Sequence, residues 1–191
     1  KKILFSDYEL NEGLFEAYEL NDNLNKFYYI GSEFNQPLGN SLNNCTALTH
    51  IDFGSSFNCH LCNSLDDCTA LSILVFGSKF NHQLLNSLVN CTSLTILVFG
   101  YSFNHPLAHS LNNCTVLTHI KFGISFNCPL ADSLNNCTAL THIEFGYDFA
   151  QRDGFPNVRF IRLNCNNRSL VENLPDSVEE LELGYRFNLE L

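Results

Sequence analysis

The feature that most constrains the fold is an internal repeat of 23 residues. One block occurs five times, as LTHIDFGSSFN (48–58), LSILVFGSKFN (71–81), LTILVFGYSFN (94–104), LTHIKFGISFN (117–127) and LTHIEFGYDFA (140–150). A unit this short cannot bury its own apolar face, so neighbouring units must stack and bury a common core. The repeat therefore predicts a solenoid.

Each unit predicts one short strand. In L-x-x-I-x-F the apolar residues alternate with polar ones, which is typical of a half-buried strand. Counting the first Leu as position one, positions four and six should point into the core, and positions three and five should face the open, concave side of the sheet. We expect about eight parallel strands, with loops and one-turn or 3₁₀ pieces on the convex side. The Gly that follows each strand is expected to let the backbone turn.

Three positions recur as rows of one residue type, which stacking would place about 4.8 Å apart. The aromatic row is expected in the core and contains Phe34, Phe57, Phe80, Phe103, Phe126 and Phe149. The amide row should satisfy backbone groups of its own and neighbouring loops and contains Asn35, Asn58, Asn81, Asn104, Asn127 and, near the end, Asn188. The thiol row is expected to be buried and contains Cys45, Cys68, Cys91, Cys114 and Cys137.

The pattern fades at both ends, as a solenoid needs in order to shield its open faces. We expect one continuous domain with an N-terminal cap or degenerate repeat in 1–26, regular repeats in 27–150, and shortened repeats with a C-terminal cap in 151–191. Within the last part, VRFIRLN (158–164) predicts one strand and VEELELGYRFN (178–188) a last near-complete unit.

Composition limits the partners and the compartment. The net charge is −10 and no Lys/Arg cluster is present, which argues against binding nucleic acid or anionic lipid. No apolar run is long enough to span a bilayer, and no signal peptide follows Lys1. Nine cysteines, five of them in one repeat position, indicate free thiols and hence a reducing, intracellular compartment.

The sequence resembles a known repeat family. The motif F-G-x-x-F-N followed by Gln36-Pro37-Leu38 or His105-Pro106-Leu107 is similar to the FNIP repeat, a subtype of leucine-rich repeat, and Leu174-Pro175-Asp176-Ser177 resembles its linker. The resemblance covers roughly 24–191 and implies a leucine-rich-repeat solenoid of the α/β horseshoe class, mainly β, with a protein-interaction role. Such arrays are abundant in social amoebae and the giant viruses that infect them, which implies a host or amoebal cytoplasm. Many follow an F-box and recruit targets for ubiquitination; here an F-box would have to precede Lys1.

The concave face offers one candidate interaction surface. Ile73, Val75, Ile96 and Val98 are expected to form an exposed apolar square, and the polar residues that frame it are His50, Asp52, His119 and Lys121. Apolar residues on the open face of a parallel sheet have no core to enter, so a contiguous patch indicates an interface. A foreign protein and a self-contact, either a homodimer or a terminal segment, both remain open as the occupant.

Other chemistry is sparse. Cys59, His82, His105 and Cys128 share one register and are zinc-ligand types, but a ladder of four spans about 14 Å, too wide for one ion. His119 and His142 should be neighbours and could form a proton-sensitive or metal-binding pair. No catalytic constellation and no phosphate-binding loop are found. We therefore expect a non-catalytic binding scaffold with no cofactor and no metal.

Overall fold

The computed structural model describes residues 26–29, 31–130, 132–151, 158–165, 167–184 and 187. The expected N-terminal cap, apart from Lys26, lies outside the described residues, as do Asn188 and parts of the shortened C-terminal repeats.

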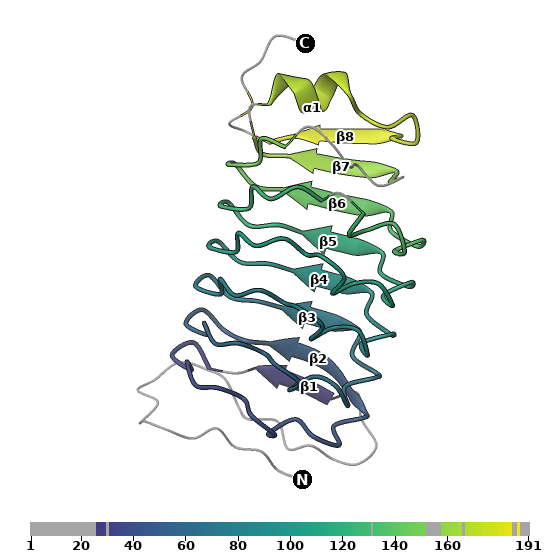
Figure 1. Ribbon diagram of the computed structural model, residues 1–191. Coiled ribbons are helices and arrows are strands. Elements are labelled where there is room, and N and C mark those ends of the chain that lie inside the picture. Colours follow the sequence, from purple (N-terminus) through teal and green to yellow (C-terminus); the bar gives the residue numbers. More distant parts are fainter. Residues whose placement is uncertain are drawn as a thin grey trace.

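Eight strands form one sheet in sequence order, every neighbouring pair parallel. The strands are β1 (Lys26–Tyr29), β2 (Leu48–Asp52), β3 (Ile73–Val75), β4 (Ile96–Val98), β5 (His119–Lys121), β6 (His142–Phe145), β7 (Phe160–Leu163) and β8 (Glu180–Leu183). Helix α1 (Arg168–Glu172) lies at the end of the stack beside β8 (Figure 1). The predicted parallel solenoid is confirmed.

The register is the same from strand to strand. His50 pairs with Ile73, Ile73 with Ile96, and Ile96 with His119, so every position of the repeat becomes a row across the sheet. From β2 to β7 positions four and six are buried, as in Ile51 and Phe53, whereas positions three and five are not. The expected assignment of the two strand faces is therefore correct.

The return segments are built from isolated turns. In each unit an N–H bonds the carbonyl three residues earlier at several separate places, as from Cys68 to Leu65 and from Leu71 to Cys68. These bonds do not run on consecutively, because Leu residues between them, such as Leu65, point into the core. The result is short turns rather than helices.

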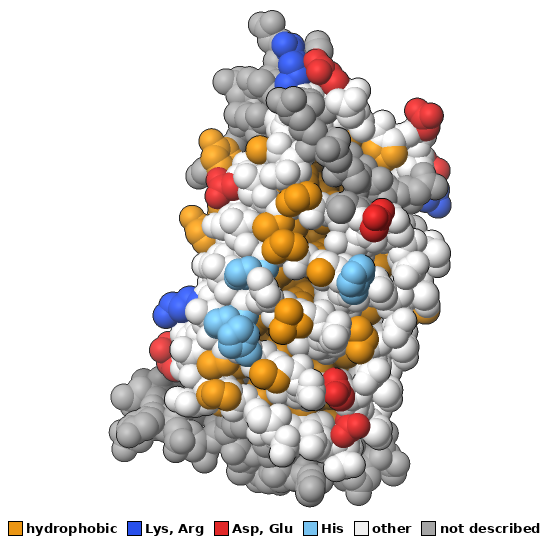
Figure 2. All heavy atoms as spheres, viewed as in Figure 1, with side chains coloured by type: hydrophobic (Ala, Val, Ile, Leu, Met, Phe, Trp, Pro, Cys, Tyr) orange, Lys and Arg blue, Asp and Glu red, His pale blue; other side chains and the backbone are white. Residues whose placement is uncertain are grey.

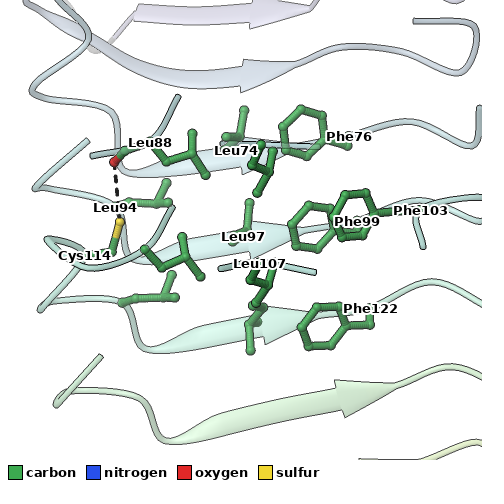
Figure 3. Packing of buried hydrophobic residues seen from close by; sticks show 14 of the residues in the cluster. Leu74, Phe76, Leu88, Leu94, Leu97, Phe99, Phe103, Leu107, Cys114 and Phe122 are labelled. Atoms are coloured by element: carbon green, nitrogen blue, oxygen red, sulfur yellow. Dashed lines mark hydrogen bonds between the residues drawn. The ribbon is translucent and has the colours of Figure 1, made fainter. Parts of the chain in front are cut away.

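Phenylalanines fill the core in two stacked rows. One row is strand position six and the other is the corner row; Phe99 and Phe103, one from each, have ring centroids 4.0 Å apart. Along the corner row Phe103 lies 6.0 Å from both Phe80 and Phe126. Figure 3 shows Phe76, Phe99 and Phe122 above one another, with Phe103 beside Phe99. Phe34, the first of the corner row, is half-buried and stacks on Phe57.

The asparagine row forms a hydrogen-bond ladder along the corner. The side-chain carbonyl of each Asn accepts the backbone N–H of the equivalent residue 23 positions later, as from Asn81 to Asn58 at 2.9 Å and from Asn104 to Asn81 at 3.0 Å. The ladder ends at Ala150. Its N–H donates to the side-chain carbonyl of Asn127, but alanine has no side-chain amide that could accept the next N–H. The amides thus link neighbouring repeats, as predicted.

The thiol row is buried except at its start. Cys68, Cys91, Cys114 and Cys137 lie in the core, and Cys114 donates to the carbonyl of Leu88 in the previous repeat at 3.7 Å (Figure 3). The prediction was wrong for Cys45, which is half-buried. Its thiol donates to the carbonyl of Asn43 in its own turn.

The glycines after the strands are required by close packing more than by turning. Of those after β2 to β6, only Gly54 has a positive φ. A Cβ at Gly100 would lie 2.1 Å from the carbonyl oxygen of Gly77, and one at Gly123 would lie 1.8 Å from that of Gly100. The backbones of successive repeats therefore touch at this point.

We expect Phe103→Ala to lower the free energy of unfolding by about 3–5 kcal/mol, the usual loss for a buried Phe. Phe103 is fully buried and packs against three rings, so its removal leaves a cavity that neighbours on a repetitive scaffold cannot fill by moving independently. A denaturant titration followed by circular dichroism measures the change. An unchanged midpoint would contradict the stacked-ring core.

We expect Gly100→Ala to destabilise the fold by about 1–3 kcal/mol or more, the range for overpacking, because the obstacle is backbone. Gly31→Ala is the matched control: nothing lies within 4 Å of a Cβ there, and the residue is exposed. Comparing the two melting curves isolates the contact. Equal midpoints would show that the repeats do not approach so closely.

Candidate interaction surface

The open sheet face consists of the strand side chains at positions three and five, which point away from the core. From β3 to β7 position three carries Ile73, Ile96, His119, His142 and Phe160. Position five carries Val75, Val98, Lys121, Glu144 and Arg162. Both rows run across the sheet without a break, so this face is two side chains wide.

The apolar square, Ile73, Val75, Ile96 and Val98, lies together on β3 and β4 as predicted. Ile73 is the register partner of Ile96, and Val75 that of Val98. The expectation that the square is fully exposed was wrong: all four side chains are half-buried, because each lies between the side chains of the neighbouring strands. The structure places His50 and Asp52 on one side of the square, on β2, and His119 and Lys121 on the other, on β5.

Ion pairs cross the part of the face beyond the square. Lys121 Nζ lies 3.0 Å from Glu144 Oε1, and Arg162 contacts Glu182 at 3.3 Å. The Lys121 side chain is half exposed, whereas that of Glu144 is 20% exposed. Exposed pairs of this kind contribute little to stability, about 0–1 kcal/mol each. Their effect is to give the face an apolar half and a charged half.

The tautomers of two histidines on this face follow from the threonine beside each. The Thr118 hydroxyl donates its one hydrogen to the carbonyl of Thr95 at 2.9 Å, so it can only accept from His119 Nδ1, 2.8 Å away. The Thr141 hydroxyl likewise donates to the carbonyl of Thr118 and accepts from His142 Nδ1. In both neutral rings Nδ1 therefore carries the proton and Nε2 has the lone pair.

The two imidazoles stack as expected from their register. Their centroids are 4.1 Å apart with planes 13° from parallel. Partial burial and then the neighbouring His142 lower the pKa of His119, because both disfavour the charged form. Parallel rings present their Nε2 lone pairs side by side instead of converging on a point, which is poor geometry for a shared metal ion.

The Cys59, His82, His105 and Cys128 row has a structural role. The ring of His82 bonds the backbone carbonyl of Asn58 at 3.0 Å, and that of His105 bonds Asn81 at 3.1 Å. Cys59 and Cys128 donate to the side-chain oxygens of Asn35 and Asn104. All four therefore link a repeat to the one before it. In the described residues no three His, Cys, Asp or Glu side chains are grouped so that they could hold a metal ion.

Sequence reasoning missed a second exposed apolar row. Tyr101, Ile124 and Tyr147 recur at the 23-residue interval, one residue after the glycine, and are 55%, 38% and 43% exposed. The 23-residue interval between these three residues was the signal that could have identified the row. The sequence interpretation considered only the glycine and phenylalanine beside them. The row is one side chain wide, and its tyrosines carry hydroxyls suited to water.

Hydrophobic side chains also lie on the face formed by the return segments (Figure 2). Its hydrophobic side chains are interspersed with histidines, acids and neutral polar groups. Leu85, the most exposed of its large hydrophobics at 62%, adopts a positive φ of 51° in a turn. None of the helices in the described part of the chain is long and apolar enough to cross a membrane.

Short parallel strands joined by compact return segments define a solenoid of the leucine-rich-repeat class. No family model matches the chain, and neither does any curated protein. Among solved structures it is similar to an internalin from Listeria monocytogenes, with a TM-score of 0.63 and 14% identity, covering 86% of this chain and 49% of the internalin. This chain thus spans about half of that protein. At such low identity the similarity shows the fold alone.

The buried thiols give a prediction about reactivity. Burial raises the pKa of Cys68 and Cys114 to about 12 and that of Cys137 to about 11, and it raises the pKa of Cys91 as well. At pH 8 these four should be alkylated at least about a hundredfold more slowly than an ordinary thiol, because the thiolate is the nucleophile. Exposed Cys62 is the internal control.

Mass spectrometry of the folded protein, alkylated without reductant, measures each site. The four buried thiols should react only after unfolding. Finding them modified as fast as Cys62, or linked to one another, would contradict the buried row.

Proposed function

We propose that this chain is a non-catalytic scaffold that binds a protein through its open sheet face. The observation that carries the proposal is the apolar square, which occupies positions that β2, β5 and β6 fill with His, Asp, Lys and Glu. Leaving apolar side chains in water adds nothing to the monomer's fold, whereas covering them contributes about 25 cal/mol per Å² of apolar area.

The surroundings of the square support this assignment. His50, Asp52, His119 and Lys121 form the polar rim expected around an apolar interface centre. The face is also held rigid, because every strand is hydrogen bonded on both sides from β2 to β7 and the Asn ladder fixes the corners. A preformed surface loses little conformational entropy on binding.

The FNIP-repeat resemblance points to the same kind of role, since that family implies protein interaction. It remains an inference from the motifs 36–38, 105–107 and 174–178. The edge row of Tyr101, Ile124 and Tyr147 is a weaker candidate, because a single line of side chains can bury little area in one contact.

The test uses Val75→Asp combined with Val98→Asp. In the free protein the new carboxylates stay hydrated at position five, so we expect the melting temperature to change little. In a complex they would be desolvated without partners, which should abolish binding. Tyr101→Asp with Ile124→Asp is the matched control, adding the same charge at the other exposed apolar row.

Melting curves are paired with sedimentation and with quantitative affinity capture from the native cell, comparing both variants with the wild type. Loss of association in the square variant alone supports the proposal. A collapsed melting temperature would mean that the strand faces are inverted. Intact association would show that the open face is not the interface.

A further inference from the structure

We propose that the occupant of the open sheet face is a second copy of this chain, packed face to face about a two-fold axis. The axis runs parallel to the strands and passes between β3 and β4. The inference rests on the proposed function, because it names the partner of the same surface.

Such an axis maps the apolar square onto itself. It places β3 of one copy opposite β4 of the other, so Ile73 meets Ile96 and Val75 meets Val98, and every contact occurs twice. Self-complementarity of one patch is the requirement for a two-fold interface. The rungs on either side of this apolar centre, on β2 and β5, are polar.

The charges flanking the square obey the same symmetry. The operation that superposes β3 on β4 places β2 opposite β5, because these strands flank the square at equal distances. Asp52 of each copy then lies opposite Lys121 of the other, and His50 lies opposite His119. Two Asp–Lys pairs of opposite charge therefore close the rim on both sides.

The other two-fold arrangement is unfavourable. An axis along the stack would place each strand opposite itself in reverse, with position three facing position five. His50 would then meet Asp52 and His142 would meet Glu144, but His119 would meet Lys121 and Glu180 would meet Glu182. Only the axis parallel to the strands pairs the charges flanking the square with their opposites.

The usual geometry of sheet packing allows Asp52 of one copy to pair with Lys121 of the other. Aligned sheets pack about 10 Å apart and rotate by about 30°. β2 and β5 lie one and a half strand spacings, about 7 Å, from the axis. A rotation of that size displaces Asp52 from Lys121 by about 4 Å, which the long lysine side chain can span.

Both charged groups have capacity for a second partner. Lys121 already contacts Glu144, but an ammonium has three donors and this side chain is half exposed. Asp52 accepts the N–H of Gly54 at 2.8 Å through Oδ1, which leaves Oδ2 available for an ammonium. Formation of the dimer therefore breaks no bond of the monomer.

The dimer should be weak. About six strands overlap in this arrangement, so the buried area falls at the low end for specific complexes, and association should depend on concentration in the micromolar range or above. Sedimentation equilibrium of the whole chain measures this association. Concentrations between about 5 µM and 500 µM, roughly two decades, cover the expected range.

The decisive experiment is a charge swap. Asp52→Lys alone and Lys121→Asp alone each place like charges opposite one another twice, and each should weaken association at least about tenfold. The double variant Asp52→Lys with Lys121→Asp restores opposite charges and should recover most of the wild-type association. Melting curves follow the fold of each variant.

Milder variants guard against misfolding. Asp52→Asn keeps an oxygen for the Gly54 N–H and removes only the charge, and Lys121→Gln keeps the length of the side chain; each should weaken association by a smaller factor. A wild-type chain that stays monomeric throughout the range overturns the inference. So does a double variant no better than the single ones.

The two proposals fail in different ways. If the chain is monomeric but Val75→Asp with Val98→Asp still removes capture of another protein, the second-copy inference is wrong and the scaffold stands. If those substitutions leave both self-association and capture of other proteins unaffected, the open face is not the interface and both are wrong.

Discussion

The close approach of successive backbones is the constraint on which the structure depends. At the end of β3 the glycine carbonyl of one repeat fills the space where the next repeat would carry a Cβ. This contact, the sheet hydrogen bonds and the Asn ladder all join residues at one fixed interval of 23. A change of register would break all three together, which explains why the central repeats keep their length so strictly.

Because the register is fixed, each position of the repeat has one environment along the whole stack. Positions such as Leu74 and Phe99 face the core in every unit and keep their apolar character. Positions three and five of the strands need not be apolar, since they face outward. Variation among Ile73, His119 and Phe160 in one row is therefore permitted by the fold, and that freedom makes the open face the natural place for recognition.

Periodicity predicted the strands, the sheet order and the direction of the strand side chains from β2 to β7, because those depend only on alternation and interval. It did not predict features that depend on distances between backbones. The steric need for Gly100 and the hydrogen bonds of His82 and Cys59 required coordinates. Cys45 shares the repeat position of the buried thiols but is half-buried, so the repeat position alone did not predict its burial.

Stacking also limits what chemistry the chain can perform. Polar groups that point along the stack are used between repeats, as with His105 and the carbonyl of Asn81. Those that point outward, as with His119 and His142, are held parallel by the sheet and by the threonines beside them. Catalysis and metal binding need groups that converge on one atom, whereas this architecture spreads them in rows. Rows suit a broad contact, and this arrangement is the physical reason for proposing that the open face binds a protein.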